Sequence, residues 1–245
     1  MSGRITVAGL GPGAEGLITP EAQAALQQAT DIIGYGPYVA RIAPRPGLNL
    51  HGSDNRVELD RARHALELAA TGARVVIVSS GDPGVFAMAS ALFEELEGWT
   101  GPVPDIRILP GITAMLAAAA RAGAPLGHDF CAINLSDNLK PFSLIEKRLR
   151  HAARGDFAMA FYNPRSASRP HQFARVLEIL REECEPNRLI IFARAISTPD
   201  ESLRSVTLDQ ATPEMADMRT VVLVGNSATR RIGPWIYTPR HAEVE

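Results

Sequence analysis

The chain has 245 residues, of which 46% are hydrophobic and 21% are charged, and its formal net charge is −2. This length suits either one large α/β domain or two small domains of roughly 100–130 residues each. The slightly acidic balance excludes a global basic field that would hold RNA or DNA, and the two cysteines lie in no C-x-x-C pair and no zinc-binding spacing.

Short apolar runs alternate with helical patterns along the first half of the chain. The predicted strands cover residues 4–11, 31–36, 74–81 and 105–111. The predicted helices cover residues 19–30, 55–72, 85–96 and 112–124. The first of these helices has the clearest start, because Thr19 suits an N-cap and Pro20 suits the first helical position.

A segment rich in Gly and Pro, residues 123–130, interrupts this pattern before a second set of elements begins. The second set has predicted strands at 131–136, 156–163, 187–195, 204–208 and 219–226, and predicted helices at 142–155 and 169–184. Alternation of this kind predicts mostly parallel sheets flanked by helices. We therefore expect an α/β protein of two domains, residues 1–114 and 115–245.

Five predicted strands end in small or amide-bearing residues. These strand ends are Gly9–Gly13, Ser80–Gly84, Pro110–Ala114, Tyr162–Arg165 and Gly225–Ser227. Because ligands bind beyond the carboxyl ends of parallel strands, we interpret these segments as loops that position a ligand through backbone contacts. Asp82 is the one carboxylate in the second segment, and the alternative for it is a tight turn in which it caps the next helix.

Common nucleotide motifs fit this sequence poorly. The spacing Gly9-x-Gly11 resembles a dinucleotide fingerprint, but Ala14 occupies the third glycine position and Pro12 lacks the N–H that a pyrophosphate needs. No Gly-Lys-Ser/Thr and no G-x-S-x-G occurs. NAD binding, ATP binding and serine hydrolysis are therefore disfavoured.

Three motifs in order, VAGLGPGAEGLITPEA, SSGDPGVF and LPGITA, resemble those of the tetrapyrrole methyltransferases, which use S-adenosylmethionine and have two α/β domains. Further stretches, IIGYGPYV, INLSDNLKPF, FAMAFYNPRSASRPHQ and TPDES, resemble the ring-contracting members, which methylate C17 of precorrin-3B in cobalamin synthesis. One departure is Arg194–Thr198, which replaces the polar stretch usual before PDE.

The resemblance implies that the cofactor, S-adenosylmethionine, lies in the cleft between the two domains and is held largely by main-chain groups. The implied cofactor residues are Pro12, Gly81, Asp82, Val85, Phe86, Thr113, Ala114, Tyr162, Asn163, Ala193, Ala195, Gly225 and Asn226. The sulfonium is already activated, so the enzyme mainly aligns the methyl group with a ring carbon and excludes water. A crowded set of acids and bases is not expected.

Ring contraction must also expel a meso carbon as an acetyl group, and this step would benefit from one proton acceptor and one proton donor. The candidate catalytic residues are Ser136, Asp137, Lys140 and Tyr162, with turn formation as the alternative role for Asp137. The implied substrate residues are Gly11, Tyr35, Arg41, Arg165 and Ser166, with Arg45, Arg56 and Arg169 as further cations. Arginines suit a polycarboxylate, although each could instead be a solvated surface residue.

Two alternatives stay open. One is a methyltransferase of the same fold that acts on another precorrin carbon, or on RNA or diphthine, although the net charge of −2 counts against RNA. The other is a module that binds S-adenosylmethionine without turnover. The sequence also leaves open whether the substrate contains cobalt. We expect no protein-bound metal, no nucleic acid partner and no membrane partner. We expect a cytoplasmic location, because the chain has no apolar run of membrane length. The resemblance also implies a homodimer.

Overall fold

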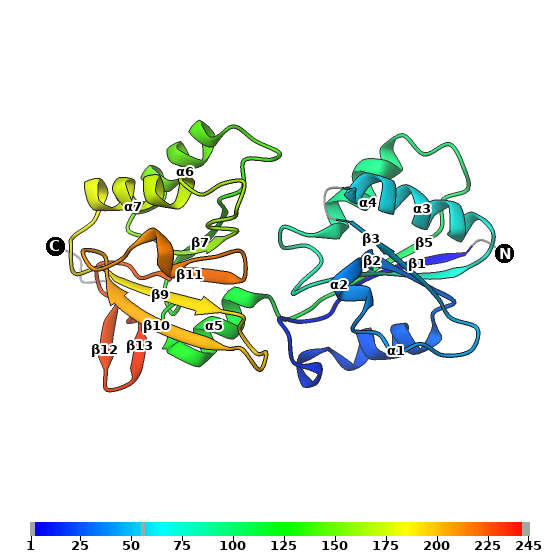
Figure 1. The fold of residues 1–245 in the computed structure, drawn as a ribbon, viewed down its shortest axis with the longest axis horizontal. Coiled ribbons are helices and arrows are strands. Elements are labelled where there is room, and N and C mark those ends of the chain that lie inside the picture. The colour runs from blue at the N-terminus through cyan, green and yellow to red at the C-terminus, as the bar shows by residue number, and fades with distance from the viewer. Residues whose placement is uncertain (1–2, 55–56, 242–245) are drawn as a thin grey trace. The chain divides into compact units, whose positions relative to one another are not determined.

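The computed structural model describes residues 3–54 and 57–241. The chain divides into two compact units, Met1–Thr113 and Ala114–Glu245. Each unit contains a five-stranded sheet with helices on both of its faces (Figure 1). The expected α/β class is confirmed, with a parallel sheet in the first unit and a sheet of mixed strand direction in the second.

In the described part of the first unit, five strands form a sheet in the order β3-β2-β4-β1-β5. They are β1 (Arg4–Gly9), β2 (Asp31–Tyr35), β3 (Asn49–Ser53), β4 (Arg74–Ser79) and β5 (Asp105–Leu109). All the pairings described for this sheet are parallel. The carboxyl ends of β4, β1 and β5 therefore lie side by side at the same end of the sheet.

The helices of this unit cover the sheet because their apolar faces pack on both of its sides. They are α1 (Pro20–Gln28), α2 (Gly36–Val39), α3 (Glu58–Ala70) and α4 (Met88–Glu97), with a short 3-10 turn at Glu15–Leu17. The Ala22 N–H donates to the Thr19 side chain at 3.3 Å, which confirms the predicted N-cap of α1. The predicted helix over 55–72 corresponds to α3, and residues 55–56 lie outside the described residues.

Two elements of the first unit have no counterpart in the sequence pattern. Strand β3 at the sheet edge is half exposed and contains no apolar run, so hydrophobic periodicity could not indicate it. Helix α2 has only four residues, which is too short for a periodic signal.

In the described part of the second unit, five strands form a sheet in the order β10-β9-β11-β8-β7. They are β7 (Phe130–Asn134), β8 (Ala158–Tyr162), β9 (Leu189–Arg194), β10 (Ser202–Thr207) and β11 (Thr220–Val224). Strands β7 and β8 are parallel, whereas β11 is antiparallel to both β8 and β9, and β10 is antiparallel to β9. The connection from Arg194 to Ser202 is too short for the crossover that a parallel pair needs.

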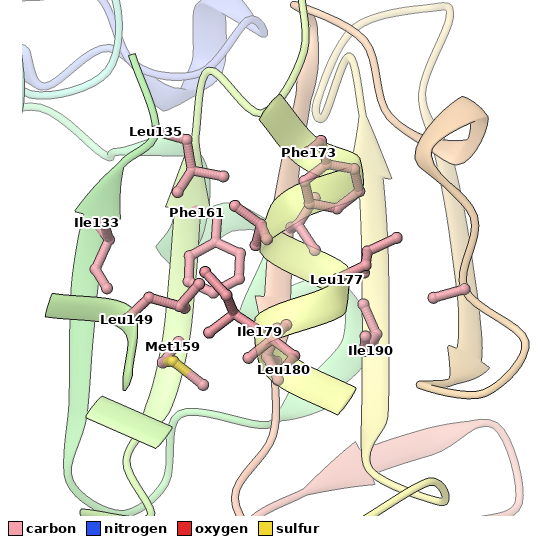
Figure 2. Close-up of a cluster of buried hydrophobic side chains, with 14 of the residues drawn as sticks. Ile133, Leu135, Leu149, Met159, Phe161, Phe173, Leu177, Ile179, Leu180 and Ile190 are labelled. Carbon is pink, nitrogen blue, oxygen red and sulfur yellow. The ribbon is translucent and has the colours of Figure 1, made fainter. Parts of the chain in front are cut away.

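The core of the second unit lies between this sheet and the helices α6 (Phe142–Arg154) and α7 (Gln172–Glu183). Figure 2 shows Phe161 of β8 and Phe173 of α7 in this cluster, and both side chains are fully buried. On the other face, the alanines of α5 (Ala114–Ala122) pack against β9 and β11. A third, small sheet consists of β6 (Gly123–Ala124), β12 (Arg230–Ile232) and β13 (Trp235–Tyr237), and the sequence pattern did not predict it.

No helix in the described part of the chain combines the length and the apolar character needed to cross a membrane.

Candidate functional site

Three glycines bring the strand ends of the first unit into backbone contact. A Cβ atom on Gly9 would lie 2.5 Å from the Gly81 carbonyl oxygen, and a Cβ atom on Gly111 would overlap the same oxygen. The Gly81 N–H donates to the Gly11 carbonyl at 2.9 Å, and the Gly11 N–H donates to the Gly81 carbonyl at 3.3 Å. We call Gly9, Gly81 and Gly111 the glycine cluster. The protein's own backbone therefore fills the space that the missing side chains of Gly9 and Gly111 leave beside Gly81.

Asp82 holds this arrangement together through both of its carboxylate oxygens. Oδ1 accepts the Gly84 N–H at 2.8 Å, and Oδ2 accepts the Gly111 N–H at 3.0 Å. Helix α4 begins at Met88, and its N-cap, Ala87, makes no side-chain cap. The alternative in which Asp82 caps this helix is therefore wrong, and the carboxylate instead fixes one strand-end loop against the next.

The residues after Asp82 include an exposed aromatic ring. Val85 closes a turn in which its N–H donates to the Asp82 carbonyl at 3.2 Å. Phe86 has a φ of 54°, in the left-handed region, and is 48% exposed. Such a conformation costs about 1–3 kcal/mol for a bulky residue and persists only where the surrounding structure imposes it. Thr113 is buried against Gly81, whose added Cβ would lie 3.3 Å from the Thr113 Cα.

Arg41 stabilises the Gly11–Pro12 turn through hydrogen bonds to its backbone. The Arg41 Nη2 donates to the Leu10 carbonyl at 3.1 Å and to the Gly13 carbonyl at 2.9 Å, one on each side of the turn. Burial lowers the pKa of Arg41, because desolvation disfavours the charged form. The structure thus gives this predicted substrate residue a role in holding the loop.

Other predicted substrate residues of the first unit are accounted for by local contacts. The ring of Tyr35 lies edge-on to that of Tyr38, with 5.3 Å between the ring centroids. Arg45 donates to three carbonyls at the carboxyl end of α1, among them that of Ala29 at 2.7 Å. Its side chain therefore caps the C-terminus of that helix. Arg56 lies outside the described residues.

In the second unit, Asn163 follows β8 in the left-handed region, with a φ of 53°. Its Nδ2 donates to Asn134 Oδ1 at 3.1 Å, and its carbonyl accepts from Nη1 of the buried Arg169 at 3.0 Å. Asn134 Oδ1 also accepts the Ser136 N–H at 3.0 Å. Sequence reasoning missed Asn134, although an amide side chain at the end of a strand was the available signal.

The other predicted residues near Asn163 lie in two groups. Tyr162 turns toward α5, where its hydroxyl oxygen accepts the Met115 N–H at 3.0 Å. Arg165 donates from Nε to the Pro170 carbonyl at 3.3 Å, and the hydroxyls of Ser166 and Ser168 lie 3.2 Å apart. The second group stabilises its own turn. Ala114, the first residue of α5, lies next to Met115.

Asp137 and Lys140 lie farther along the loop that follows β7, and both side chains are partly buried. The Ser136 hydroxyl accepts the Asn138 N–H at 3.4 Å, which is turn chemistry within this loop.

Strand β9 ends in a tight loop at the same edge of the sheet as Asn163. Ala195 and Ser197 have φ values of 49° and 61°, and the Ala195 N–H donates to the Arg219 carbonyl at 2.8 Å. Ala193 is buried within the sheet, between β10 and β11 and under the alanine face of α5. Ala195 is 7% exposed and Ala193 is 1% exposed, so both side chains are buried, but Ala195 lies in the loop and Ala193 lies inside the sheet.

Gly225 and Asn226 do not join these residues. Because β11 is antiparallel to β8, its carboxyl end lies beside the amino end of β8, where the Ser227 N–H donates to Asp156 at 2.9 Å. The five residues of β8 separate the two edges by roughly 15 Å at about 3.3 Å per residue. The expectation that all strand ends meet at one edge is wrong for β11.

The amino end of β11, rather than its carboxyl end, lies at the same end of the sheet as Asn163 and Ala195. Thr220 pairs with Arg194 there, and Arg219 precedes it. Sequence reasoning missed Arg219 and Thr220. The short connection between β9 and β10 was the available signal, because it forces an antiparallel pair and so reverses the order of the strand ends.

The chemistry of these edges is sparse. In residues 3–54 and 57–241, no group of three or more His, Cys, Asp or Glu side chains could hold a metal ion. The first unit offers a carboxylate and an exposed ring, Asp82 and Phe86. The second offers amides, main-chain groups and the Tyr162 hydroxyl, and its charged side chains Arg194 and Arg219 are paired with Asp217 at 2.7 Å and with Asp200 at 3.0 Å. Such an arrangement suits the positioning of an already reactive ligand.

Comparison with known proteins gives a consistent result. The family model of the Tetrapyrrole (Corrin/Porphyrin) Methylases matches residues 4–212. A Sinorhizobium protein named precorrin-3B C(17)-methyltransferase is 47% identical over 249 residues, which cover 98% of this chain and 97% of that protein. The solved structure of the methyltransferase CobJ is 78% identical, with a TM-score of 0.95, and the match covers 97% of this chain and 100% of that one.

The chain also matches part of a longer relative. The Mycobacterium bovis cobalamin biosynthesis protein CobIJ is 44% identical over 234 residues, which cover 94% of this chain but 46% of that protein. The chain therefore spans about half the length of this mycobacterial relative.

Proposed function

Because the chain belongs to the tetrapyrrole (corrin/porphyrin) methylases, we propose that it methylates precorrin-3B at C17, with ring contraction to precorrin-4, in cobalamin biosynthesis. The observation that carries this proposal is the full-length similarity to the Sinorhizobium enzyme, which is named for that substrate and that carbon. We propose the metal-free precorrin as the substrate, since this relative is named for it, and keep the cobalt-containing counterpart for the test.

The proposed methyl donor is S-adenosylmethionine, whose sulfonium supplies an activated methyl group. The described residues fit a ligand that carries positive charge. The two Asp82 oxygens each accept one backbone N–H and retain further lone pairs, and the exposed ring of Phe86 offers a π-face. Main-chain groups of Gly81, Thr113 and Pro12 would complete the contacts in the first unit.

In the second unit we propose that Asn163, Ala195 and the Tyr162–Asn163 main chain contact the rest of the cofactor. Thr220 joins this set because it lies at the same edge of the sheet. Gly225 and Asn226 are not part of it, because β11 is antiparallel to β8 and ends at the opposite end of the sheet. Ala193 is not part of it either, because it pairs within the sheet with both β10 and β11. Ala114 stays a candidate as the first residue of α5.

The chain's part in methyl transfer is to hold the reactants in line and to exclude water, which can lower a barrier by several kcal/mol. Ring contraction needs proton transfer as well, and the candidates are Ser136, Asp137, Lys140 and Tyr162. Ser136 and Tyr162 lie on neighbouring strand ends, joined through the Leu135 N–H, which donates to the Tyr162 carbonyl at 2.9 Å. The Tyr162 oxygen accepts the Met115 N–H, and its own O–H is the group that can donate a proton.

The test is incubation of the purified protein with methyl-labelled S-adenosylmethionine and a panel of precorrins that includes the cobalt-containing counterpart of precorrin-3B. Label in a product that has lost its meso bridge, with precorrin-3B as the substrate, is the expected result. Label that appears only with another precorrin contradicts the substrate. Binding of the donor without any transfer of label contradicts the activity and favours the binding module.

We further propose a homodimer in the cytoplasm and domains that divide at 1–114 and 115–245. The family resemblance supports the homodimer, the lack of an apolar run of membrane length supports the location, and the pattern of predicted elements supports the division into domains. Sedimentation should give twice the chain mass of 26.4 kDa, and limited proteolysis near residue 114 should release two stable fragments.

A further inference from the structure

The asparagines at the ends of β7 and β8 form a pair of side-chain amides whose orientation the main chain fixes. The Ser136 N–H donates to Asn134 Oδ1 at 3.0 Å. A main-chain N–H can only donate, so the Asn134 atom that it meets must be the oxygen and not the nitrogen. The Asn163 atom that lies 3.1 Å from this same oxygen must then be its nitrogen, Nδ2.

The pair depends on the backbone that follows β8. Ile133, the neighbour of Asn134, and Phe161 both belong to the buried cluster that contains the α7 side chains (Figure 2). Asn134 and Tyr162, which pair across the two strands, therefore face the opposite side of the sheet. A regular strand would place Asn163 on the side of Phe161, away from Asn134. The left-handed φ of 53° at Asn163 breaks this alternation and lets the two amides meet.

Arg169 holds the main chain of Asn163 in this conformation. Arg169 is buried, and its Nη1 donates to the Asn163 carbonyl at 3.0 Å. Arg169 thus contacts the backbone of Asn163, whereas Asn134 contacts its side chain. The two contacts together fix both the peptide and the amide of Asn163.

This pairing leaves the amide oxygen of Asn163 for a ligand. Because Nδ2 is directed at Asn134, Oδ1 is directed away from it, and no group in the described part of the chain donates to that oxygen. Asn163 is also only partly buried. An amide oxygen accepts hydrogen bonds and cannot donate, so it suits a ligand group that carries a hydrogen, namely a hydroxyl or an amine.

We propose that Asn134 is a positioning residue, which orients Asn163 so that its Oδ1 accepts a hydrogen bond from a hydroxyl or amino group of the cofactor's adenosine. This inference rests on the proposed contact between Asn163 and S-adenosylmethionine and deepens it, because it states which atom makes the contact and which chemistry it selects. Asn134 acts through Asn163. A site of this kind rejects a ligand that lacks the donor, since Oδ1 is then left unpaired.

The test measures Kd by calorimetry for S-adenosylhomocysteine, which binds without turnover, and for three analogues of it. The analogues lack the 2′-hydroxyl, the 3′-hydroxyl or the 6-amino group. The wild type should bind one of the three about tenfold more weakly than the parent ligand. Which analogue this is distinguishes a ribose hydroxyl from the adenine amine as the donor.

Three variants of the loop after β7 test the role of Asn134. In Asn134→Ala the Asn163 amide can rotate and present either atom, so the discrimination should shrink to about twofold and the parent Kd should rise about fivefold. Asn134→Asp keeps an oxygen that accepts from both N–H donors, so it should retain the wild-type discrimination. The matched control is Asn138→Ala, because Asn138 is exposed in the same loop and its side chain makes no hydrogen bond with the described residues. This control should change neither value.

Asn163→Gly separates the amide from the backbone, because glycine adopts a left-handed φ without strain. This variant should keep the loop conformation and lose the discrimination between the parent ligand and the analogue. It also carries the test if Asn134→Ala does not fold, since discrimination that persists in Asn163→Gly would overturn the proposal.

The outcome that counts against Asn134 is a uniform one. Equal weakening of all four ligands in Asn134→Ala, with their ratios unchanged, would show a merely structural role and overturn the proposal. A wild type that binds the three analogues as tightly as the parent, or binds none of the four, would overturn it as well. These measurements need no methyl transfer, so a failure to label precorrin-3B counts against the proposed function and leaves the result on Asn134 unaffected.

Discussion

Replacing Gly111 with alanine tests whether the glycine cluster serves the protein's own packing. The added Cβ would overlap the Gly81 carbonyl oxygen and lie 2.9 Å from the Gly9 Cα and 3.1 Å from the Gly81 carbonyl carbon. All three are backbone atoms, so no side chain can rotate away and the strand-end loops must move apart.

The magnitude follows from two opposing effects. Overpacking costs about 1–3 kcal/mol, and the rigid backbone neighbours place Gly111→Ala near the upper end. The smaller entropy of the unfolded chain offsets about 0.4–1 kcal/mol of this cost. A net loss of about 2 kcal/mol corresponds to a fall in Tm of about 4–8 °C for a chain of this size.

The assay is thermal unfolding together with the Kd for S-adenosylmethionine by calorimetry. The matched control is Gly16→Ala, because a Cβ on Gly16 meets nothing within 4 Å. Gly111→Ala should lose stability and bind the donor more weakly, whereas Gly16→Ala should keep both properties. A Gly111→Ala protein that unfolds and binds like the wild type would refute the packing argument.

The remaining predictions test the two edges, the Asp82 contacts and one ion pair. Asn163→Ala should weaken binding of S-adenosylmethionine about tenfold. Asn226→Ala should leave this binding unchanged, since Asn226 lies at the opposite end of the strands. Calorimetry that ranks the two variants the other way contradicts the placing of Asn163 and Asn226 at opposite ends. Asp82→Asn keeps one acceptor oxygen for two backbone N–H groups, so unfolding should show a loss of about 1–2 kcal/mol, and an unchanged Tm would mean that the carboxylate charge is not needed. Hydrogen bonds from two arginines of α6 lower the pKa of Glu183 from 4.5 to about 2. A carboxyl group with a depressed folded-state pKa stabilises the protein above its unfolded pKa and loses that contribution as the pH falls. The Tm difference between wild type and Glu183→Gln should therefore be full at neutral pH and shrink between about pH 4.5 and about pH 2, and a difference that stays constant over this range would show that the ion pairs do not set the pKa.

Local sequence signals determined most elements of both units. A β-branched run, a cap or a helical period acts over a few neighbouring residues, so it can be read directly from the chain. Thr19 is an example, because its side chain caps α1 as the sequence predicted. Edge strand β3 is the counterexample, because a half-exposed strand needs no apolar run.

The candidate site was predicted less completely. The loops around Gly81 and Asn163 were found because small or amide-bearing residues follow buried strands. The contacts that hold these loops were missed, since Asn134 and Arg169 lie 29 and 6 residues from Asn163 in the sequence and act on it only through the folded backbone. No spacing rule joins such residues.

The sequence by itself determined the α/β class, the family resemblance and the small-residue loops at the strand ends. Only the tertiary structure decided that β11 runs against β8, which moves Asn226 away from Asn163 and brings Thr220 into its place. It also decided that the glycines serve the protein's own packing. The physical reason is that strand direction and close backbone approach depend on pairing between distant segments, whereas a sequence pattern reports only the environment of each segment along its own length.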